Sequence, residues 1–222
     1  MKYIEKKLNN QPPSLIQHKN QPHHSYENYS GKAELRDFLL KDQAYLCCYC
    51  MTRIQTPTED KMGIEHLKPF SAYNGENGKP DLRLEYKNLL ATCKGGEGGP
   101  KHLFHCDKAK WDAEIKLDPT NKQLMDLIKF DANGFIYTDI EEYDREINEV
   151  LKLNVEPLRK ARLSIWRSLE QIIKKEFGNK PVKRSFINEK IKVWSKCNRQ
   201  GMAEQYCQVA VYYLKKKLSK AV

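Results

Sequence analysis

Two sets of residues in the first half of this 222-residue chain are of types that do chemistry. The first set is four of the seven cysteines, which lie in two groups: Cys47, Cys50, Cys93 and Cys106. Two residues between Cys47 and Cys50 allow one turn to direct both thiolates at one ion, and four thiolates are a common ligand set of tetrahedral zinc. Twelve residues lie between Cys93 and Cys106, so His102 or His105 is an alternative for one ligand.

The second set is the adjacent pair Glu65 and His66, which falls between the two cysteine groups. An imidazole can take a proton from water near neutral pH, and a carboxylate binds hard cations such as Mg²⁺ or Mn²⁺. Hydrolysis of a phosphodiester uses both, together with groups that hold the phosphate. A Glu-His pair alone is an ordinary surface dipeptide, but Asn88 and Asp107 follow this one, so we interpret it as a cutting site.

Short elements must position these residues. We expect irregular structure over 1–30, with Ser30 capping a helix over about 32–45 that leads into the Cys47 turn. The pattern then predicts a strand over 64–67, a return to the core at 88–93, a glycine-rich linker at 95–100, a helix over 107–115 and a hairpin over 130–137. Three further helices are predicted, from Pro157 to Gly178, after Ser185, and over about 202–218.

The charge of the chain is unevenly divided. Residues 1–144 carry 20 Lys and Arg against 22 Asp and Glu, whereas residues 145–222 carry 19 against 7, a net charge of +12. This one-sided charge predicts a polyanionic partner such as nucleic acid, with a solvated helical surface as the alternative. We therefore expect a catalytic half over 1–144 and a basic helical region over 145–222 that binds nucleic acid, a partner protein or both.

No stretch approaches the roughly 20 apolar residues of a membrane span, and the basic N-terminal residues lack the apolar segment of a secretion signal. We expect a cytoplasmic protein that does not contact a membrane. An odd number of cysteines then favours metal binding and free thiols over disulfides. Cys48, Cys197 and Cys207 are expected in the core, and His18, His23 and His24 in solvent.

The combination of motifs over residues 47–110 resembles the zinc-containing HNH endonucleases, which have the ββα-metal fold. The resemblance rests on Cys47-x-x-Cys50, Glu65-His66-x-x-Pro69, Asn88-Leu89, Cys93 and Cys106-Asp107-x-x-Lys110. It implies an α+β protein with a zinc-stabilised ββα-metal nuclease core and a mostly α-helical C-terminal region. It also implies structural Zn²⁺ at the four cysteines and a catalytic Mg²⁺ or Mn²⁺.

The resemblance also implies a role for each matching residue. His66 is the general base, Glu65 a ligand of the catalytic metal, and Asn88 the residue that holds the His-bearing loop by hydrogen bonds. Asp107 stands where the family has His or Asn, and its oxygen still suits magnesium, so it is the expected second ligand, with His105 as the alternative. Lys110 is expected to contact the scissile phosphate.

A narrower resemblance is to the PtuB-type HNH proteins of Septu and retron-associated anti-phage systems. It rests on Cys-x-Tyr-Cys at 47–50, Ile-Glu-His-x-x-Pro at 64–69, Tyr-x-Asn-Leu-Leu at 86–90, His-Cys-Asp-x-x-Lys at 105–110 and Leu-Asp-Pro-Thr at 117–120. It implies a defence nuclease that acts with an ATPase partner of the PtuA type. The expected substrate is DNA, with structured RNA such as tRNA as the alternative. A zinc-ribbon module that binds nucleic acid or a partner without cutting is a further alternative.

Overall fold

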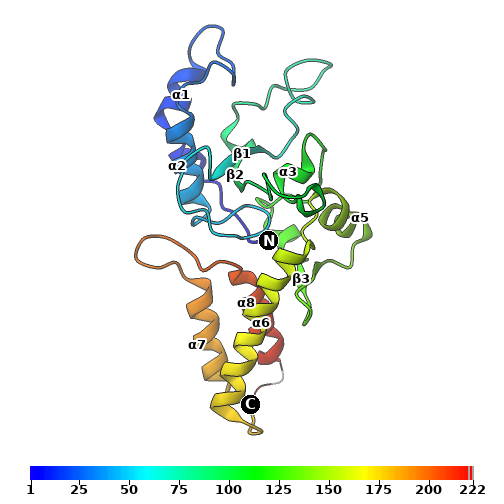
Figure 1. Cartoon of the computed structure of the whole chain (residues 1–222). Helices are drawn as coiled ribbons and strands as arrows, with labels where there is room; N and C mark the ends of the chain where they lie inside the picture. Colours follow the sequence, from blue (N-terminus) through cyan, green and yellow to red (C-terminus); the bar gives the residue numbers. More distant parts are fainter. Residues whose placement is uncertain (220, 222) are drawn as a thin grey trace.

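The computed structural model describes residues 1–219 and residue 221. Figure 1 shows an upper part built of short strands and helices, above a stem of longer helices. This mixture agrees with the predicted α+β class. Within the described residues, no helix is both long enough and apolar enough to cross a membrane.

Two antiparallel strands form the centre of the upper part, β1 (Met62–His66) and β2 (Leu89–Cys93). Their register places Glu65 opposite Leu90 and His66 opposite Leu89. The predicted strand is therefore confirmed, two residues longer at its start and one shorter at its end. Because β2 is apolar and buried over most of its length, it anchors the exposed turn-rich segment that separates the two strands.

Helix α2 (Lys32–Asp42) packs against β2. The buried Gln43 amide, just beyond the helix, donates to the Ala91 carbonyl oxygen at 2.8 Å and accepts from the Ala91 N–H at 2.7 Å. The helix ends earlier than predicted because Ala44 and Tyr45 have positive φ angles of 50° and 63°. Ser30 is not its cap, since Gly31 occupies that position.

The N-terminal segment is better ordered than its polar composition predicts. It contains the 3₁₀ turn η1 (Leu8–Asn10) and helix α1 (Pro13–Lys19). Met1, Ile4 and Leu15 are buried in the main core. His18 was expected in solvent but is buried, with Nε2 at 2.9 Å from the Ser25 carbonyl oxygen, whereas His23 and His24 are exposed as predicted.

Short elements lie between the two strands and between β2 and the stem. In chain order they are η2 (Tyr86–Asn88), η3 (Lys101–Leu103), α3 (Asp107–Lys110), α4 (Lys122–Asp126), β3 (Lys129–Phe130), β4 (Ile136–Tyr137), α5 (Glu141–Arg145) and the π-helical turn η4 (Glu146–Val150). The predicted hairpin is confirmed by the β3–β4 pairing, with Gly134 at φ 80° in its turn. Helix α3 is much shorter than predicted, because the chain leaves helical geometry at Trp111, where φ is 52°.

The stem consists of α6 (Glu156–Phe177), α7 (Arg184–Ser195) and α8 (Cys207–Leu218). All three predicted helices are present, although α8 begins later than expected. Cys207 is buried at its start, as predicted, whereas Cys197 is exposed beyond the end of α7, so its predicted burial is wrong.

The stem and the upper part share one hydrophobic core. The segment before α8 reaches back to the cysteine turn: the Ala203 N–H donates to the Ala44 carbonyl oxygen at 3.1 Å, and the Tyr206 N–H to that of Met51 at 3.2 Å. The Tyr206 hydroxyl also lies 3.0 Å from Oγ1 of Thr52. Residues beyond 145 therefore complete the packing around the cysteine turn.

Candidate functional site

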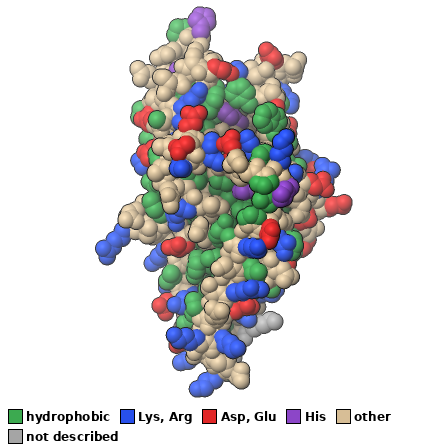
Figure 2. All heavy atoms as spheres, in the orientation of Figure 1, with side chains coloured by type: hydrophobic (Ala, Val, Ile, Leu, Met, Phe, Trp, Pro, Cys, Tyr) green, Lys and Arg blue, Asp and Glu red, His purple; other side chains and the backbone are tan. Residues whose placement is uncertain are grey.

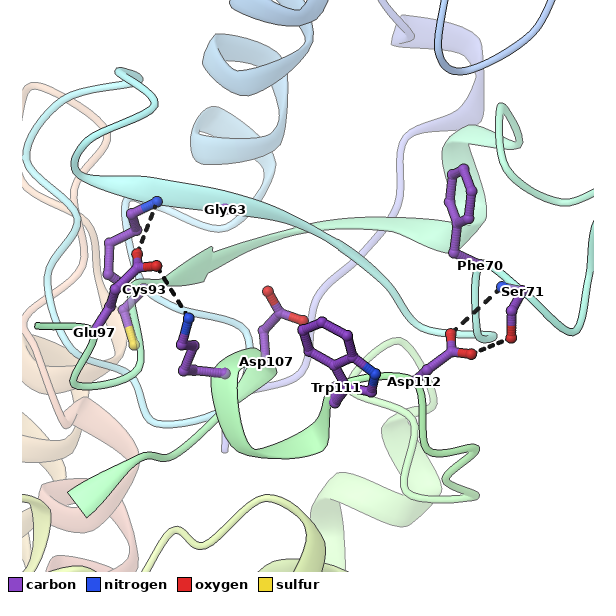
Figure 3. Close-up of a pocket in the computed structure, with 10 residues that line it drawn as sticks. Gly63, Phe70, Ser71, Cys93, Glu97, Asp107, Trp111 and Asp112 are labelled. Atoms are coloured by element: carbon purple, nitrogen blue, oxygen red, sulfur yellow. Dashed lines mark hydrogen bonds and ion pairs between the residues drawn. The ribbon is translucent and has the colours of Figure 1, made fainter. Parts of the chain in front are cut away.

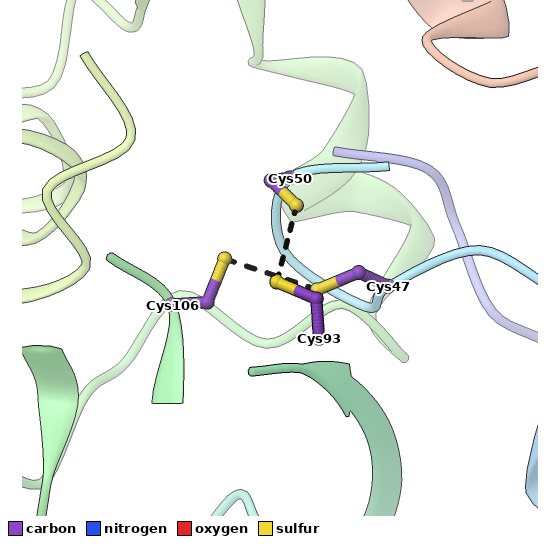
Figure 4. A group of neighbouring side chains, drawn as sticks. All are labelled: Cys47, Cys50, Cys93 and Cys106. Carbon is purple, nitrogen blue, oxygen red and sulfur yellow. Dashed lines mark hydrogen bonds between the residues drawn. The ribbon is translucent and has the colours of Figure 1, made fainter. Parts of the chain in front are cut away.

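Four cysteines from three separate segments meet in the upper part (Figure 4). The Sγ atoms of Cys47, Cys50, Cys93 and Cys106 all lie within 4.8 Å of one another. Cys47 Sγ is 3.8 Å from Cys106 Sγ, and Cys50 Sγ is 3.7 Å from Cys93 Sγ. These separations are far longer than the roughly 2.05 Å of a disulfide. Four sulfurs at about 2.3 Å from one tetrahedral ion stand about 3.8 Å apart, so this cluster fits a metal ion such as zinc.

The local backbone explains why the sulfurs converge. In the Cys47–Cys50 turn, the Thr52 N–H donates to Cys50 Sγ at 3.5 Å, which orients that sulfur. The glycine-rich loop folds back on itself, and the His105 N–H donates to the Gly95 carbonyl oxygen at 3.0 Å. Gly95 has φ 56°, and a Cβ there would collide with the His105 carbonyl oxygen, so this reversal requires glycine.

Within the cysteine cluster, the surroundings favour ionisation of the Cys47 thiol but not of the Cys106 thiol. Burial raises the pKa of the Cys106 thiol well above its usual range. At Cys47 the same burial is outweighed by hydrogen bonds from Cys106 and the neighbouring thiols, which hold its pKa well below that range. A cation is therefore needed to hold all four sulfurs as thiolates.

The predicted alternatives to a cysteine ligand lie elsewhere. His105 Nδ1 is 2.9 Å from the Leu103 carbonyl oxygen, and His102 is exposed in η3. Cys48 is buried, as predicted, but outside the cluster. Among the described residues, the group of side chains that could together hold a metal ion contains cysteines alone.

Next to the cysteine cluster, Glu65 and Lys110 form a buried ion pair. Oε1 of Glu65 lies 2.9 Å from Nζ of Lys110, and each side chain is 1% exposed. The same oxygen accepts a hydrogen bond from the Tyr49 hydroxyl at 2.7 Å. Burial and the nearby Asp107 carboxylate raise the pKa of Glu65 well above its usual range, and Lys110 opposes this shift. The carboxyl groups of Glu65 and Asp107 would together offer oxygen donors to a divalent cation.

Asp107 lies on the wall of a pocket of about 480 Å³ (Figure 3). The pocket is bounded by β1, the end of β2 and α3, and its lining includes Gly63, Phe70, Lys94, Asp107, Lys108 and Trp111. A Cβ on Gly63 would approach Asp107 Oδ2 to 3.3 Å, so this glycine keeps space open beside the carboxylate. Gly63 and Glu65 are two residues apart on β1 and therefore share one face of the strand.

His66, at the end of β1, is oriented by the turn-rich segment between the strands. Its Nε2 lies 3.0 Å from the Arg83 carbonyl oxygen, so Nε2 carries the proton and Nδ1 keeps a lone pair. Its ring packs edge-to-face against Tyr26 at 4.7 Å and Phe70 at 5.1 Å, between ring centroids. Burial lowers the pKa of His66, while the Arg83 bond and the Asp107 carboxylate oppose the shift. The imidazole therefore stays neutral to lower pH than an ordinary histidine, and its Nδ1 lone pair can accept a proton.

The buried Asn88 side chain fixes the backbone directly after His66. Its Oδ1 accepts from the Lys68 N–H at 2.7 Å, and its Nδ2 donates to the carbonyl oxygens of Lys68 at 3.2 Å and Leu82 at 3.1 Å. These hydrogen bonds use both polar atoms of the Asn88 amide. They link Lys68 to Leu82, which lie near the two ends of the turn-rich segment.

The structure thus gathers the predicted residues into two adjoining sites, the cysteine cluster and the region around Glu65, His66 and Asp107. Lys110, expected near a phosphate, instead lies in the buried pair and also donates to the His66 carbonyl oxygen at 3.2 Å. The motifs did not identify Tyr49 or the Arg83 carbonyl as partners. Tyr49 stands inside the Cys-x-Tyr-Cys pattern and could have been suspected, whereas the Arg83 contact depends on a long loop and leaves no local signal.

Comparison with curated proteins finds a relative that is similar to part of this chain. Over 112 residues the chain is 34% identical to an Escherichia coli protein of retron Ec83 that is predicted to be an HNH endonuclease. This match covers 46% of the present chain and 42% of that relative, so the chain spans less than half of the relative's length. No family model matches the chain. By sequence, the chain is therefore similar to a predicted HNH endonuclease over about half of its length.

Proposed function

We propose that this protein is a metal-dependent endonuclease of the HNH type that hydrolyses nucleic-acid phosphodiester bonds. The observation that carries the proposal is the neighbourhood of His66 and Asp107: a neutral, oriented imidazole near a carboxylate that lines an open pocket. The likeness to the retron Ec83 protein supports the same class. In this proposal β1, β2 and α3 are the ββα-metal core, and the cysteine cluster holds a structural Zn²⁺ that does not touch the substrate.

In this mechanism His66 acts as the general base through Nδ1. The Arg83 carbonyl holds the Nε2 proton, which fixes the tautomer, and Asn88 holds the backbone of the loop that follows. Nδ1 takes the proton of a water that attacks phosphorus in line with the leaving 3′ oxygen. The products are then a 5′ phosphate and a 3′ hydroxyl.

Glu65 and Asp107 would hold a Mg²⁺ or Mn²⁺ ion, which when bound supplies charge neutralisation at the phosphate. Asp107 offers its oxygens to the pocket, and Glu65 reaches the same region from β1. Lys110 would position Glu65 through the buried ion pair rather than contact the phosphate.

The stem supplies a surface for a polyanion. Within residues 145–219 the only side-chain ion pair is Glu156–Lys160, so most of the positive charge there has no acidic partner. Figure 2 shows Lys and Arg side chains on the lower end of the stem. The ends of three helices meet there and carry Lys174, Lys175, Arg184, Lys215, Lys216 and Lys217. We call these six residues the stem tip and propose that it binds nucleic acid or an acidic surface of an ATPase partner.

We further propose that the nuclease is the effector of an anti-phage defence system of the PtuB type, acting on DNA with an ATPase of the PtuA type. The supporting observations are the motif set over 47–120 and the likeness to a retron protein. Structured RNA is the second candidate substrate, because the hydrolytic site places no visible requirement on the sugar.

The direct test is incubation of the purified protein with end-labelled DNA and RNA in Mg²⁺ or Mn²⁺, with and without the ATPase. We expect cleavage that His66→Ala reduces by at least about 100-fold, the usual scale of a lost general base. The matched control is His23→Ala, which removes an exposed histidine far along the chain from the site. Bound metal and nucleic-acid affinity without metal-dependent cleavage would instead identify a non-catalytic zinc-ribbon module.

The role of the stem tip is tested by charge reversal, since deletion of residues 145–222 would also remove part of the shared core. A Lys174→Glu, Lys175→Glu, Arg184→Glu protein is expected to keep its fold but to lose affinity for nucleic acid, the ATPase or both. Measuring each binding reaction at several salt concentrations separates the two roles, because phosphate contacts weaken steeply as salt rises. Unchanged binding of both ligands would refute the proposed stem-tip surface.

A further inference from the structure

Trp111 is the most exposed large hydrophobic side chain among the described residues, at 80% of its maximum. It follows α3 directly, and its N–H donates to the Asp107 carbonyl oxygen at 2.8 Å. Its indole adds nothing to the hydrophobic core, so folding alone gives no reason for a tryptophan here.

The backbone at Trp111 is unfavourable for any residue with a Cβ. Its φ and ψ are 52° and −121°. Gly178, which ends α6, has almost the same angles, 56° and −117°. Glycine adopts this conformation without steric cost, whereas a bulky aromatic residue does not. The chain therefore holds a strained tryptophan at a position suited to glycine, and such strain is concentrated at functional sites.

The indole stands at the rim of the pocket that contains Asp107 (Figure 3). Phe70 lines the same pocket and also contacts the His66 ring, so aromatic surface extends from the candidate base to the pocket. Lys94 and Lys108 lie on the pocket wall, and both pair with Glu97, at 3.2 Å and 3.1 Å. Two lysines share the single Glu97 carboxylate, so the rim combines a flat aromatic face with lysine charge that this carboxylate does not fully neutralise and that can contact a phosphate.

We infer that Trp111 is a stacking platform for an unpaired nucleobase next to the bond to be cut. This inference rests on the proposed nuclease function and adds the substrate class: a single-stranded, looped or flipped-out nucleotide of DNA or RNA. Indole rings stack on any base because every base has a π face. In a continuous duplex those faces are covered by neighbouring base pairs, so the platform discriminates against intact duplex.

The test measures binding in a His66→Ala background with Mg²⁺, so that affinity is read without turnover. The ligands are a fluorescein-labelled 12-nucleotide single strand of DNA, the same sequence as RNA, and the corresponding DNA duplex. We expect Trp111→Gly to weaken single-strand binding by about 5- to 150-fold, the scale of one lost stacking contact. Trp111→Phe retains most of the affinity, and duplex binding changes little.

Two controls separate stacking from a structural role. Trp111→Gly relieves the backbone strain, so its melting temperature should equal or exceed that of the parent, and lost affinity then cannot be attributed to unfolding. Leu8→Ala removes a different exposed hydrophobic side chain and should leave all three affinities unchanged. A preference for the DNA or the RNA strand in these assays identifies which nucleic acid the platform receives.

The stacking platform and the nuclease function are refuted by different results. Unchanged single-strand affinity in Trp111→Gly, or an equal loss for strand and duplex, overturns the stacking platform even if wild type cleaves nucleic acid. Trp111-dependent binding by a wild-type protein that cleaves neither DNA nor RNA refutes the nuclease and leaves the platform as a binding site for unpaired nucleotides.

Discussion

The Lys110 ammonium lies 2.9 Å from the Glu65 carboxylate, and both side chains are withdrawn from solvent. The pair joins β1 to α3 and is completed by the Tyr49 hydroxyl from the cysteine turn. A charge buried in this way depends on its partner, because removing one member leaves the other uncompensated in a low-dielectric interior.

Lys110→Met should therefore lower the free energy of unfolding by about 3–5 kcal/mol. Lys108→Met, which breaks only a partly exposed pair with Glu97, should cost less than about 1 kcal/mol. Adding Glu65→Gln to Lys110→Met should restore part of the loss, because no carboxylate then remains unpaired. Urea unfolding of the four proteins checks this, and equal effects of the two single lysine changes would contradict it.

The cysteine cluster predicts one tightly bound metal ion per chain. Cys106→Ser should abolish that metal and prevent folding, because the free energy of metal binding to such a site, about 10–16 kcal/mol for structural zinc, contributes directly to folding. Cys197→Ser changes an exposed thiol outside the cluster and should keep the metal and the fold. Metal analysis and circular dichroism provide the measurement. A folded Cys106→Ser protein with its full metal content would show that the cluster is not the metal site.

The environment of His66 predicts a particular pH dependence. Burial lowers its pKa, so the neutral base persists to lower pH than an ordinary imidazole, and activity is lost only as the pH falls through this lowered value. The acidic limb of kcat/KM should therefore have its midpoint below about 6.5. Phe70→Ala uncovers the ring and should move the midpoint upward. An acidic limb centred above 7 would contradict this assignment.

Arg162 in α6 is buried with carbonyl oxygens as its partners. It donates to Gly134 at 2.7 Å, to Leu153 at 2.9 Å and to Oδ1 of Asn154 at 2.9 Å, and burial lowers its pKa to about 10. Arg162→Met leaves these acceptors without donors and should destabilise the protein by roughly 2–4 kcal/mol.

Arg162→Lys should recover little of that loss, because an ammonium lacks the planar guanidinium geometry. Arg167→Met, on the exposed side of α6, should change stability by less than about 0.5 kcal/mol. Thermal melts distinguish these variants. An Arg162→Met protein with the melting temperature of wild type would contradict the structural role of Arg162.

Local sequence patterns predicted the local parts of the structure. The spacing of Cys47 and Cys50 indicates a turn that directs both sulfurs at one ion, and the pattern from Pro157 to Gly178 predicted α6 closely. The approach of Cys93 to Cys106 could not be derived in the same way, because it depends on a reversal at Gly95 that only the three-dimensional contacts show. The early end of α3 was missed for a related reason. Nothing in the composition around Trp111 signals a positive φ.

The burial of Lys110 was also beyond sequence reasoning. A lysine one turn along a helix from Asp107 predicts an exposed cation, and only the approach of β1 converts it into the partner of Glu65. The N-terminal segment was misjudged because its few apolar residues are widely spaced, yet Met1, Ile4 and Leu15 each reach the core. Scattered apolar residues carry no periodicity, so tertiary packing decides their structure.

The contacts from Ala203 and Tyr206 to the cysteine turn have a consequence during synthesis. The ribosome completes residues 47–110 long before it reaches residue 203, so the nascent chain carries every candidate ligand while the turn still lacks these backbone partners. The packing around the cysteine turn is therefore complete only after the segment before α8 has been synthesised. An incomplete chain therefore has the candidate ligands without the backbone contacts that hold the cysteine turn in the full-length protein.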